Sequence, residues 1–152
     1  MTSTYGLYKK ITAVPFGGRV FSTFFARKAP YFSTVRPDVQ AMEPHFAQVR
    51  VPKRKAVENH IGTVHAIAVC NGLEAAMGLL AEATVPSDKR WLPKGMDVEY
   101  LAKSTSDIVC TASTTPEDWE NGPDVPVTVI ASRDDGTIVV QGVINLWVTP
   151  KR

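Results

Sequence analysis

The most strongly apolar part of the chain lies near its middle. Residues 65–83 are apolar on nearly every side of a helix, and this pattern predicts a helix buried in a core. Pro86 prevents that helix from continuing far. Glu74 stands isolated among the apolar residues around it. Burying an ionised carboxylate is costly unless something uses it, so Glu74 is the first candidate for chemistry.

The residues after this helix alternate between apolar and polar, as half-buried strands do. Such runs occupy residues 96–103, 108–113, 127–133 and 137–149. The last two runs are joined by Asp134-Asp135-Gly136, which is a strong hairpin signal. The pattern therefore predicts four strands after the buried helix.

The part of the chain before the buried helix is more varied. Residues 5–11 and 17–26 have helical spacing. Residues 30–44 are rich in Pro, Asp and aromatic residues without a period, which predicts an ordered lid or connector. A first strand is predicted over about residues 46–57, followed by a loop over 58–64. The expected order is helices, one strand, the buried helix and four strands.

One long apolar helix and an antiparallel sheet pack most economically when the sheet curls around the helix. That α+β arrangement is the hotdog fold, with a curved antiparallel sheet wrapped around one central helix. The 152 residues are close to the usual size of one domain. We therefore expect a single hotdog domain over residues 1–152, with 1–45 as an N-terminal helical or lid segment and 46–152 as the hotdog core.

The charged residues nearly balance, with 17 Lys plus Arg against 15 Asp plus Glu. A dedicated nucleic-acid binder has a strong basic excess, so no nucleic-acid partner is expected. Cys70 and Cys110 have the character of small reduced core residues, which indicates a reducing compartment. The apolar residues after Lys9 and Lys10 are interrupted by Pro15, so neither a signal peptide nor a membrane span is expected. We expect a cytoplasmic protein.

The His and Cys residues have none of the spacings of known metal sites. The chain also lacks a Gly-rich nucleotide loop and a nucleophile elbow. We therefore expect no metal and no cofactor.

A family resemblance rests on Asn59, Gly62-Thr63-Val64-His65 and Glu74. This stretch resembles the active-site stretch of hotdog-fold acyl-CoA thioesterases of the phenylacetate-pathway type. Residues 58–101, including Arg90 to Met96, also resemble an uncharacterised bacterial branch of that superfamily. In element order the resemblance extends over roughly residues 16–149, but only 59–74 carries information about a site.

The resemblance implies a hydrolase of acyl-CoA thioesters and a role for each matched position. The Asn six residues before the His helps to position the catalytic machinery, which corresponds to Asn59 before His65. The amide just after the His points at the thioester oxygen, here at Ala66, and the acid nine residues after it, Glu74, is nucleophile or base. Gly62, Thr63, Val64 and Ile67 are the implied substrate-binding positions, and the Ile67 amide is also a candidate second donor to the oxyanion. The usual His-Gly-Gly is His65-Ala66-Ile67 here.

The chemistry favours the same assignment. Thioester hydrolysis needs donors for an oxyanion and a carboxylate that attacks or activates water, and the first turn of a helix supplies free amides. Glu74 is eight residues after Ala66, which is about 12 Å along a helix, whereas both groups must lie about 3 Å from one reacting centre. We therefore predict a homodimer, possibly pairing into a tetramer, with two shared sites.

Each assignment has an alternative. Glu74 could be a structural acid paired with Lys or Arg or facing a solvated cleft, His65 could fix the loop by hydrogen bonding, and Asn59 could be a turn residue. The basic run over residues 50–55 could meet coenzyme A phosphates or be a solvated strand edge. The alternative for the whole protein is a noncatalytic acyl-CoA-binding or regulatory hotdog module.

Four phenylalanines in the N-terminal segment also have two interpretations. They could line an acyl pocket, or they could belong to a helix that caps the open side of the sheet. These residues are Phe16, Phe21, Phe24 and Phe25.

Overall fold

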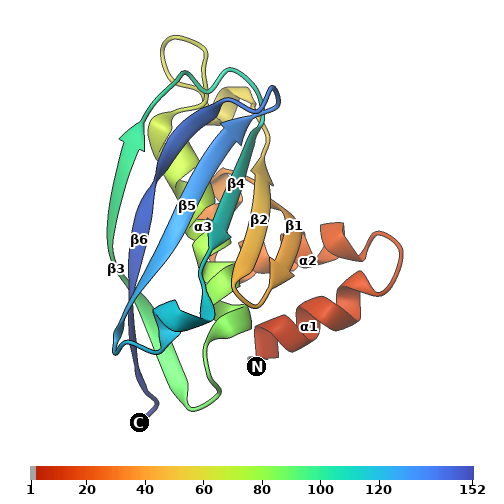
Figure 1. Cartoon of the computed structure of the whole chain (residues 1–152). Helices are drawn as coiled ribbons and strands as arrows, with labels where there is room; N and C mark the ends of the chain where they lie inside the picture. Colours follow the sequence, from red (N-terminus) through yellow and green to blue (C-terminus); the bar gives the residue numbers. More distant parts are fainter. Residues whose placement is uncertain (1–2) are drawn as a thin grey trace.

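A central helix, α3 (Ala66–Thr84), lies in the concave face of a curved sheet (Figure 1). The computed structural model describes residues 3–152. The sheet has six strands in the order β1-β2-β4-β5-β6-β3, and all neighbouring strands are antiparallel. This is the hotdog arrangement expected from the sequence, so the predicted fold class is confirmed.

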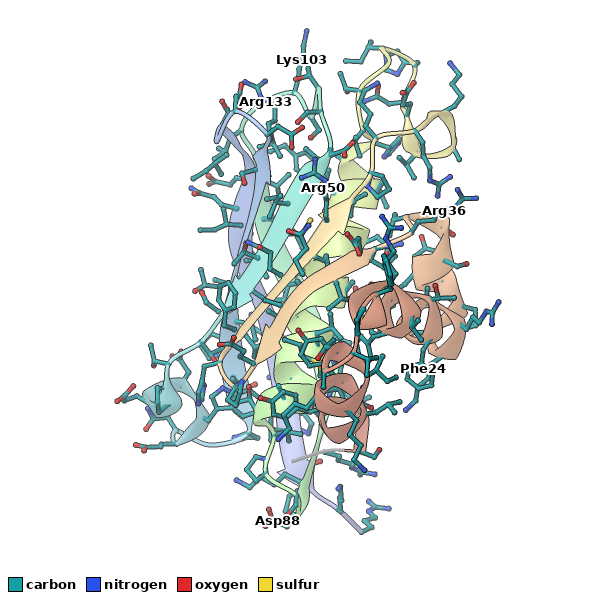
Figure 2. The ribbon with its side chains drawn as sticks, turned by 90° about the vertical axis from the view of Figure 1, so that its right-hand side faces the viewer. Phe24, Arg36, Arg50, Asp88, Lys103 and Arg133 are labelled. Carbon is teal, nitrogen blue, oxygen red and sulfur yellow. The ribbon has the colours of Figure 1, made fainter. Side chains whose placement is uncertain are left out.

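The strands are β1 (Asp38–Glu43), β2 (Phe46–Val51), β3 (Lys89–Tyr100), β4 (Ile108–Ser113), β5 (Asp124–Arg133) and β6 (Ile138–Pro150). The other helices are α1 (Ser3–Thr12) and α2 (Gly17–Lys28). Short 3-10 turns are η1 (Pro30–Thr34), η2 (Lys55–Val57) and η3 (Pro116–Trp119). The N-terminal helices lie on the β1 side of the molecule, where α2 contacts β1 and α1 contacts α3 (Figure 2).

The core lies between α3 and the concave face of the sheet. Leu73, Leu79 and Leu80 of α3 are fully buried, and alternate residues of β4 and β5 point toward them. In the described part of the chain, α3 is also the one helix long and apolar enough to cross a membrane, and 67% of that apolar window is buried. Its apolar composition is therefore accounted for by its position inside the sheet.

The helix approaches the sheet most closely at Gly72. A Cβ atom there would lie 2.6 Å from Cγ2 of Val51 and 2.7 Å from Sγ of Cys110. Glycine lowers helix stability because of its conformational freedom. Close packing against β2 and β4 therefore explains why a glycine occupies the middle of the core helix.

Two expectations about the strands were wrong. Strand β1 lies within residues 30–44, which the sequence pattern assigned to a lid or connector. Its buried residues, Val39 and Met42, are three positions apart because the pairing register shifts between Val39 and Ala41. That bulge hides the two-residue period of a strand. The strand predicted over 46–57 ends at Val51, because Pro52 has no N–H for the ladder, and the chain then forms η2.

Strand β3 is longer than the pattern indicates and forms an edge of the sheet. It begins at Lys89 rather than near Met96, and its register against β6 shifts between Pro93 and Gly95. In the described chain it pairs with β6 alone, and most of its residues are exposed, including Leu92 at 61%. A long exposed edge strand with apolar side chains is a surface suited to pairing with another chain.

Candidate active site

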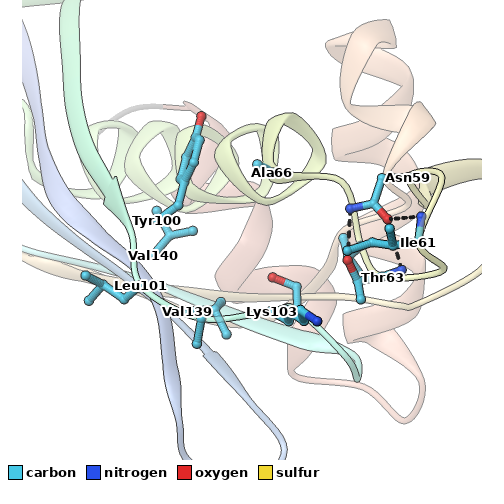
Figure 3. Close-up of a pocket in the computed structure, with 12 residues that line it drawn as sticks. Asn59, Ile61, Thr63, Ala66, Tyr100, Leu101, Lys103, Val139 and Val140 are labelled. Atoms are coloured by element: carbon cyan, nitrogen blue, oxygen red, sulfur yellow. Dashed lines mark hydrogen bonds between the residues drawn. The ribbon is translucent and has the colours of Figure 1, made fainter.

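The loop before α3 is organised by the side chain of Asn59. Its Oδ1 accepts hydrogen bonds from the backbone N–H groups of Ile61 and Thr63, each at 3.1 Å, and its Nδ2 donates to Oγ1 of Thr63 at 2.9 Å (Figure 3). Gly62 has a φ of 77°, a conformation that glycine adopts without strain. Asn59 is thus the residue that builds this turn, whatever further role it has.

The first turn of α3 is capped by His65. Its Nδ1 accepts a hydrogen bond from the Ile67 N–H at 3.0 Å, which caps the helix start. The His65 N–H donates to the Val57 carbonyl at 2.8 Å. Within residues 3–152 the Ala66 N–H has no hydrogen-bond partner. Ala66 therefore keeps a free amide in this first turn, whereas the Ile67 amide is already occupied.

A cavity of about 350 Å³ opens beside this helix start (Figure 3). Four of the predicted site residues line it, namely Asn59, Thr63, Val64 and Ala66. The sequence analysis missed Tyr100, which lines the same cavity from the end of β3. Gly62, His65 and Ile67 do not line it.

The Tyr100 hydroxyl lies 4.0 Å from the Sγ atom of Cys70, which is in the next turn of α3. Burial raises the pKa of the Cys70 thiol, and the neighbouring thiol raises the pKa of Tyr100. Both groups therefore remain protonated at neutral pH. Cys70 and Cys110 are free thiols, as the sequence indicated.

Glu74 is half-buried on another part of the same helix, where it lines two further cavities. One has a volume of about 330 Å³ and is walled mostly by aromatic and apolar side chains, among them Phe25, Phe32 and Trp91. Its lining also includes the charged residues Lys28 and Glu82. The other, about 240 Å³, lies between α3 and η1 and is also lined by Asn71. Asn71 is a further residue that the sequence analysis did not select, although it lies on the same helix three residues before Glu74.

The carboxylate of Glu74 forms no hydrogen bond or ion pair with another residue in the described part of the chain. The alternative in which a Lys or Arg holds it as a structural acid therefore lacks its partner. The next acid on this helix behaves differently, because Glu82 accepts a hydrogen bond from Nε1 of Trp91 at 2.9 Å. A free carboxylate beside an apolar cavity is a group available for acid–base chemistry.

The aromatic residues of α2 have two separate functions. Phe21 is fully buried and packs edge-on against Tyr8, so it caps the core. Phe25 stacks on Phe32 with 5.3 Å between ring centroids, and both line the larger cavity beside Glu74. Two other phenylalanines, Phe16 and Phe24, do not line that cavity.

The basic run over residues 50–55 is largely engaged within the chain. Arg50 forms salt bridges with Asp107 and Asp134, both at 3.1 Å. Lys53 bonds Glu58 at 2.7 Å, and this hydrogen bond lowers the pKa of the Glu58 carboxyl. These cations stabilise the loops around the helix start. In residues 3–152, no group of three or more His, Cys, Asp and Glu side chains is placed to hold a metal ion.

The antiparallel sheet wrapped around a single core helix defines a hotdog-fold protein. Residues 17–148 match the model of one protein family. The chain belongs to that family, which is described as a domain of unknown function, DUF4442.

Comparison with solved structures supports the assignment of the fold. The structural-genomics target APC5556 is 38% identical, with a TM-score of 0.86 over 97% of this chain and 99% of that chain. PA5026 of Pseudomonas aeruginosa, described as a protein of unknown function and probable thioesterase, is 18% identical, with a TM-score of 0.77 over 91% and 97% of the two chains. A thioesterase family protein from Silicibacter pomeroyi is 17% identical, with a TM-score of 0.70 over 86% and 99%. No curated protein matches the sequence significantly.

The predicted hotdog fold is therefore confirmed, and it is shared with proteins described as thioesterases. Membership of a family of unknown function agrees with the predicted resemblance to an uncharacterised branch. The fold and the family do not establish the roles of individual residues. Ala66 and Glu74 line different cavities of the one chain, as expected from the helical rise between them.

Proposed function

We propose that this protein is a thioesterase that hydrolyses acyl-CoA at a site shared by two copies of the chain. One observation carries the proposal: α3 holds an unpartnered amide at Ala66 and an unpartnered carboxylate at Glu74, each facing its own cavity. These are the two groups that thioester hydrolysis requires. The names given to the proteins from P. aeruginosa and S. pomeroyi support the same reaction class.

In the proposed reaction the thioester oxygen accepts a hydrogen bond from the Ala66 N–H at the positive end of the helix dipole. Glu74 of the partner subunit acts as base toward water, or as nucleophile. In the first case the water oxygen bonds the carbonyl carbon and its proton passes to the carboxylate. The carbon–sulfur bond then breaks, and the thiolate takes that proton to leave as free coenzyme A. Gly62 of the preceding loop and Ile67 of the first turn of α3 are both exposed and border the proposed approach of the substrate.

Pairing of two chains is part of the proposal. An antiparallel, two-fold arrangement would bring Glu74 of one α3 beside Ala66 of the other, and the relation would be reciprocal. The exposed edge of β3 offers an unpaired row of backbone groups for such a dimer. Light scattering over a dilution series would distinguish monomer, dimer and tetramer.

The larger cavity beside Glu74 suits the acyl group. Its volume of about 330 Å³ lies in the range of small-ligand pockets, and its walls include Phe25, Met77 and Trp91. Apolar walls favour a hydrocarbon or aromatic group over a charged one. The acyl part would then lie next to the carboxylate, with the coenzyme A part extending outward.

The test is release of free thiol across a panel of acyl-CoA substrates, from acetyl to long-chain and aromatic acyl groups. We expect turnover of at least one apolar acyl-CoA. Coenzyme A disulfide, which contains no thioester, is the negative control and should release no thiol. A noncatalytic acyl-CoA-binding module is the second candidate. It is favoured by Ile67, which is 54% exposed at a position where the thioesterases that the motif resembles usually have glycine. Binding of acyl-CoA without thiol release would select that second candidate.

The setting that we propose is the cytoplasm, where acyl-CoA is available and free cysteines are kept reduced. Both cysteines of the chain are free and buried.

A further inference from the structure

Asn71 carries a buried polar atom that nothing in the fold uses. The residue is only 8% exposed, and its Oδ1 is buried without a hydrogen-bond partner. Buried side-chain polar atoms are almost always hydrogen-bonded, because leaving one without a partner destabilises the folded state. An unsatisfied amide in the middle of a core helix therefore indicates a role outside the fold itself.

The position of Asn71 connects this atom with Glu74. The two residues are three apart on α3, a spacing at which side chains of a helix are neighbours, with Cβ atoms about 5–6 Å apart. Both line the cavity of about 240 Å³ between α3 and η1. On its other side, Asn71 borders a separate cavity of about 200 Å³, which His65 and Ala68 also line. The amide therefore stands between the carboxylate and the start of the helix.

The cavity is large enough for water. One water occupies about 30 Å³ in the liquid, and a buried water needs two or more polar partners. The Glu74 carboxylate on one wall is one such partner. Oδ1 of Asn71 is buried in the described rotamer and becomes the second partner when the amide turns about its χ2 bond to face the cavity. The opposite wall is formed by Ala29, Pro30, Tyr31 and Phe32, so the Tyr31 hydroxyl is the polar side-chain group on that wall.

We propose that Asn71 holds the hydrolytic water beside Glu74. One water O–H donates to the Glu74 carboxylate and the other to Oδ1 of Asn71, so the lone pairs of the water oxygen face the thioester carbon. When that oxygen bonds the carbon, Glu74 takes one proton and later returns it to the departing sulfur. Asn71 gains and loses nothing. The inference rests on the proposed thioesterase activity and names a residue of that same site.

A purely structural role does not explain the residue equally well. Asparagine is a weak helix former, because its side chain competes for backbone hydrogen bonds. In the described structure the Asn71 side chain forms no hydrogen bond that would offset this weak helix propensity. A leucine of similar size would bury apolar surface and leave no unsatisfied atom. The fold alone therefore favours an apolar residue at this position.

The test compares Asn71→Leu with Asn71→Asp in the full-length protein. For Asn71→Leu we expect an unchanged or higher Tm, kcat lower by about 10- to 100-fold and KM within about threefold of the wild type. Asn121→Leu, the same change in an exposed turn, is the matched control and should alter neither Tm nor kcat. Asn71→Asp keeps the acceptor but places a second carboxylate beside Glu74, which raises the pKa of the pair. In a plot of kcat/KM against pH, the fall in activity on the acid side should therefore occur at higher pH for Asn71→Asp than for the wild type. Activity should recover at pH values above that fall.

The possible outcomes separate the two proposals. A wild type that hydrolyses acyl-CoA together with an Asn71→Leu variant of unchanged kcat would overturn the role of Asn71 alone. A fall in Tm, with kcat restored on cooling, would identify a structural residue and overturn it as well. An Asn71→Asp profile with the wild-type acid limb would contradict the contact with Glu74. A wild type that releases no thiol from any substrate would overturn both this inference and the proposed function.

Discussion

The indole Nε1 of Trp91 donates a hydrogen bond to the carboxylate of Glu82 at 2.9 Å, which ties the edge strand β3 to the central helix α3. The Trp91 ring forms part of the wall of the larger cavity beside Glu74. On the helix side, Gly78 faces that ring, and a Cβ atom on Gly78 would lie 3.5 Å from it, an ordinary contact distance. The width of the proposed acyl cavity is therefore set by this pair of elements.

Gly78 provides a test of the acyl cavity. Gly78→Leu should fill part of the cavity and lower kcat/KM for long or aromatic acyl groups by about tenfold or more, while short acyl groups keep most of theirs, because each methylene in an apolar pocket changes binding by about 1–3 kcal/mol. Gly78→Ala is the control, since its Cβ fits. Steady-state kinetics over the acyl-CoA panel measures both. Equal losses for every chain length in Gly78→Leu would place the acyl group elsewhere.

Glu74→Gln tests the carboxylate. The change keeps size and hydrogen bonding but removes the base, so turnover should fall by roughly two to four orders of magnitude while acyl-CoA binding persists. Thiol release and calorimetric binding of a nonhydrolysable acyl-CoA analogue measure the two effects. Glu117→Gln, on an exposed 3-10 turn, is a control that should retain full turnover. Wild-type turnover in folded Glu74→Gln protein would remove the carboxylate from the mechanism.

The backbone amide of Ala66 can be deleted with proline. Ala66 is the first residue of α3 and its N–H has no described partner, so proline is tolerated there by the helix. Ala66→Pro should lose about two to three orders of magnitude in turnover, the usual effect of one oxyanion donor. Ala66→Gly keeps the amide and should retain or improve hydrolysis by easing substrate approach. Thermal unfolding and acyl-CoA binding must accompany the rates, since only a folded Ala66→Pro protein with normal turnover would contradict the assignment.

Mixing the two inactive variants tests whether the site is shared. In a hybrid dimer of Glu74→Gln and Ala66→Pro chains, one site carries both changes and the other carries neither. Equal mixing gives half hybrid dimers, so about a quarter of the wild-type activity should return. The measurement is thiol release after the two proteins are unfolded and refolded together. Each variant refolded alone is the control, and no recovery in a mixture that contains hybrids would assign both groups to one chain.

Gly72 tests the packing of the core. Gly72→Val introduces atoms where even a Cβ would overlap Val51 and Cys110, so the helix must move away from the sheet. Overpacking of this kind costs about 1–3 kcal/mol, and sometimes more. Urea unfolding should give a midpoint below that of the wild type. Gly6→Val, where a Cβ would meet nothing, is the comparison on a helix outside the core.

The long elements were predictable because their patterns are strong. The apolar run over residues 65–83 corresponds to α3 at Ala66–Thr84, and the signal at residues 134–136 lies between β5 and β6. Strand β1 and the first half of β3 were missed, since each contains a register shift that breaks the alternation. A bulge is a property of the pairing with another strand, and the sequence of one strand does not reveal it.

The candidate site was predictable only where it is local. Asn59, Thr63 and Ala66 surround one cavity because a short turn and the helix start bring neighbouring residues together. The walls of the cavity beside Glu74 come instead from α2, η1 and β3, which only the tertiary fold brings together. Asn71 was within reach of sequence reasoning, as a polar residue one turn from Glu74 on an apolar helix. The catalytic roles of these residues stay predictions.

Strand β3 has a consequence for how substrate preference and assembly could change together. Its residues Trp91 and Pro93 wall the proposed acyl cavity, while its free edge is the surface proposed for pairing. A substitution at Pro93 that reshapes the cavity would lie next to the register shift between Pro93 and Gly95 and would therefore also act on the pairing edge. Two relatives with different acyl preferences would then have β3 edges of different shape. Such edges would pair less well with each other than with an identical edge, so mixed dimers would be disfavoured. The same strand would thus determine both which acyl group is accepted and which chain is accepted as dimer partner.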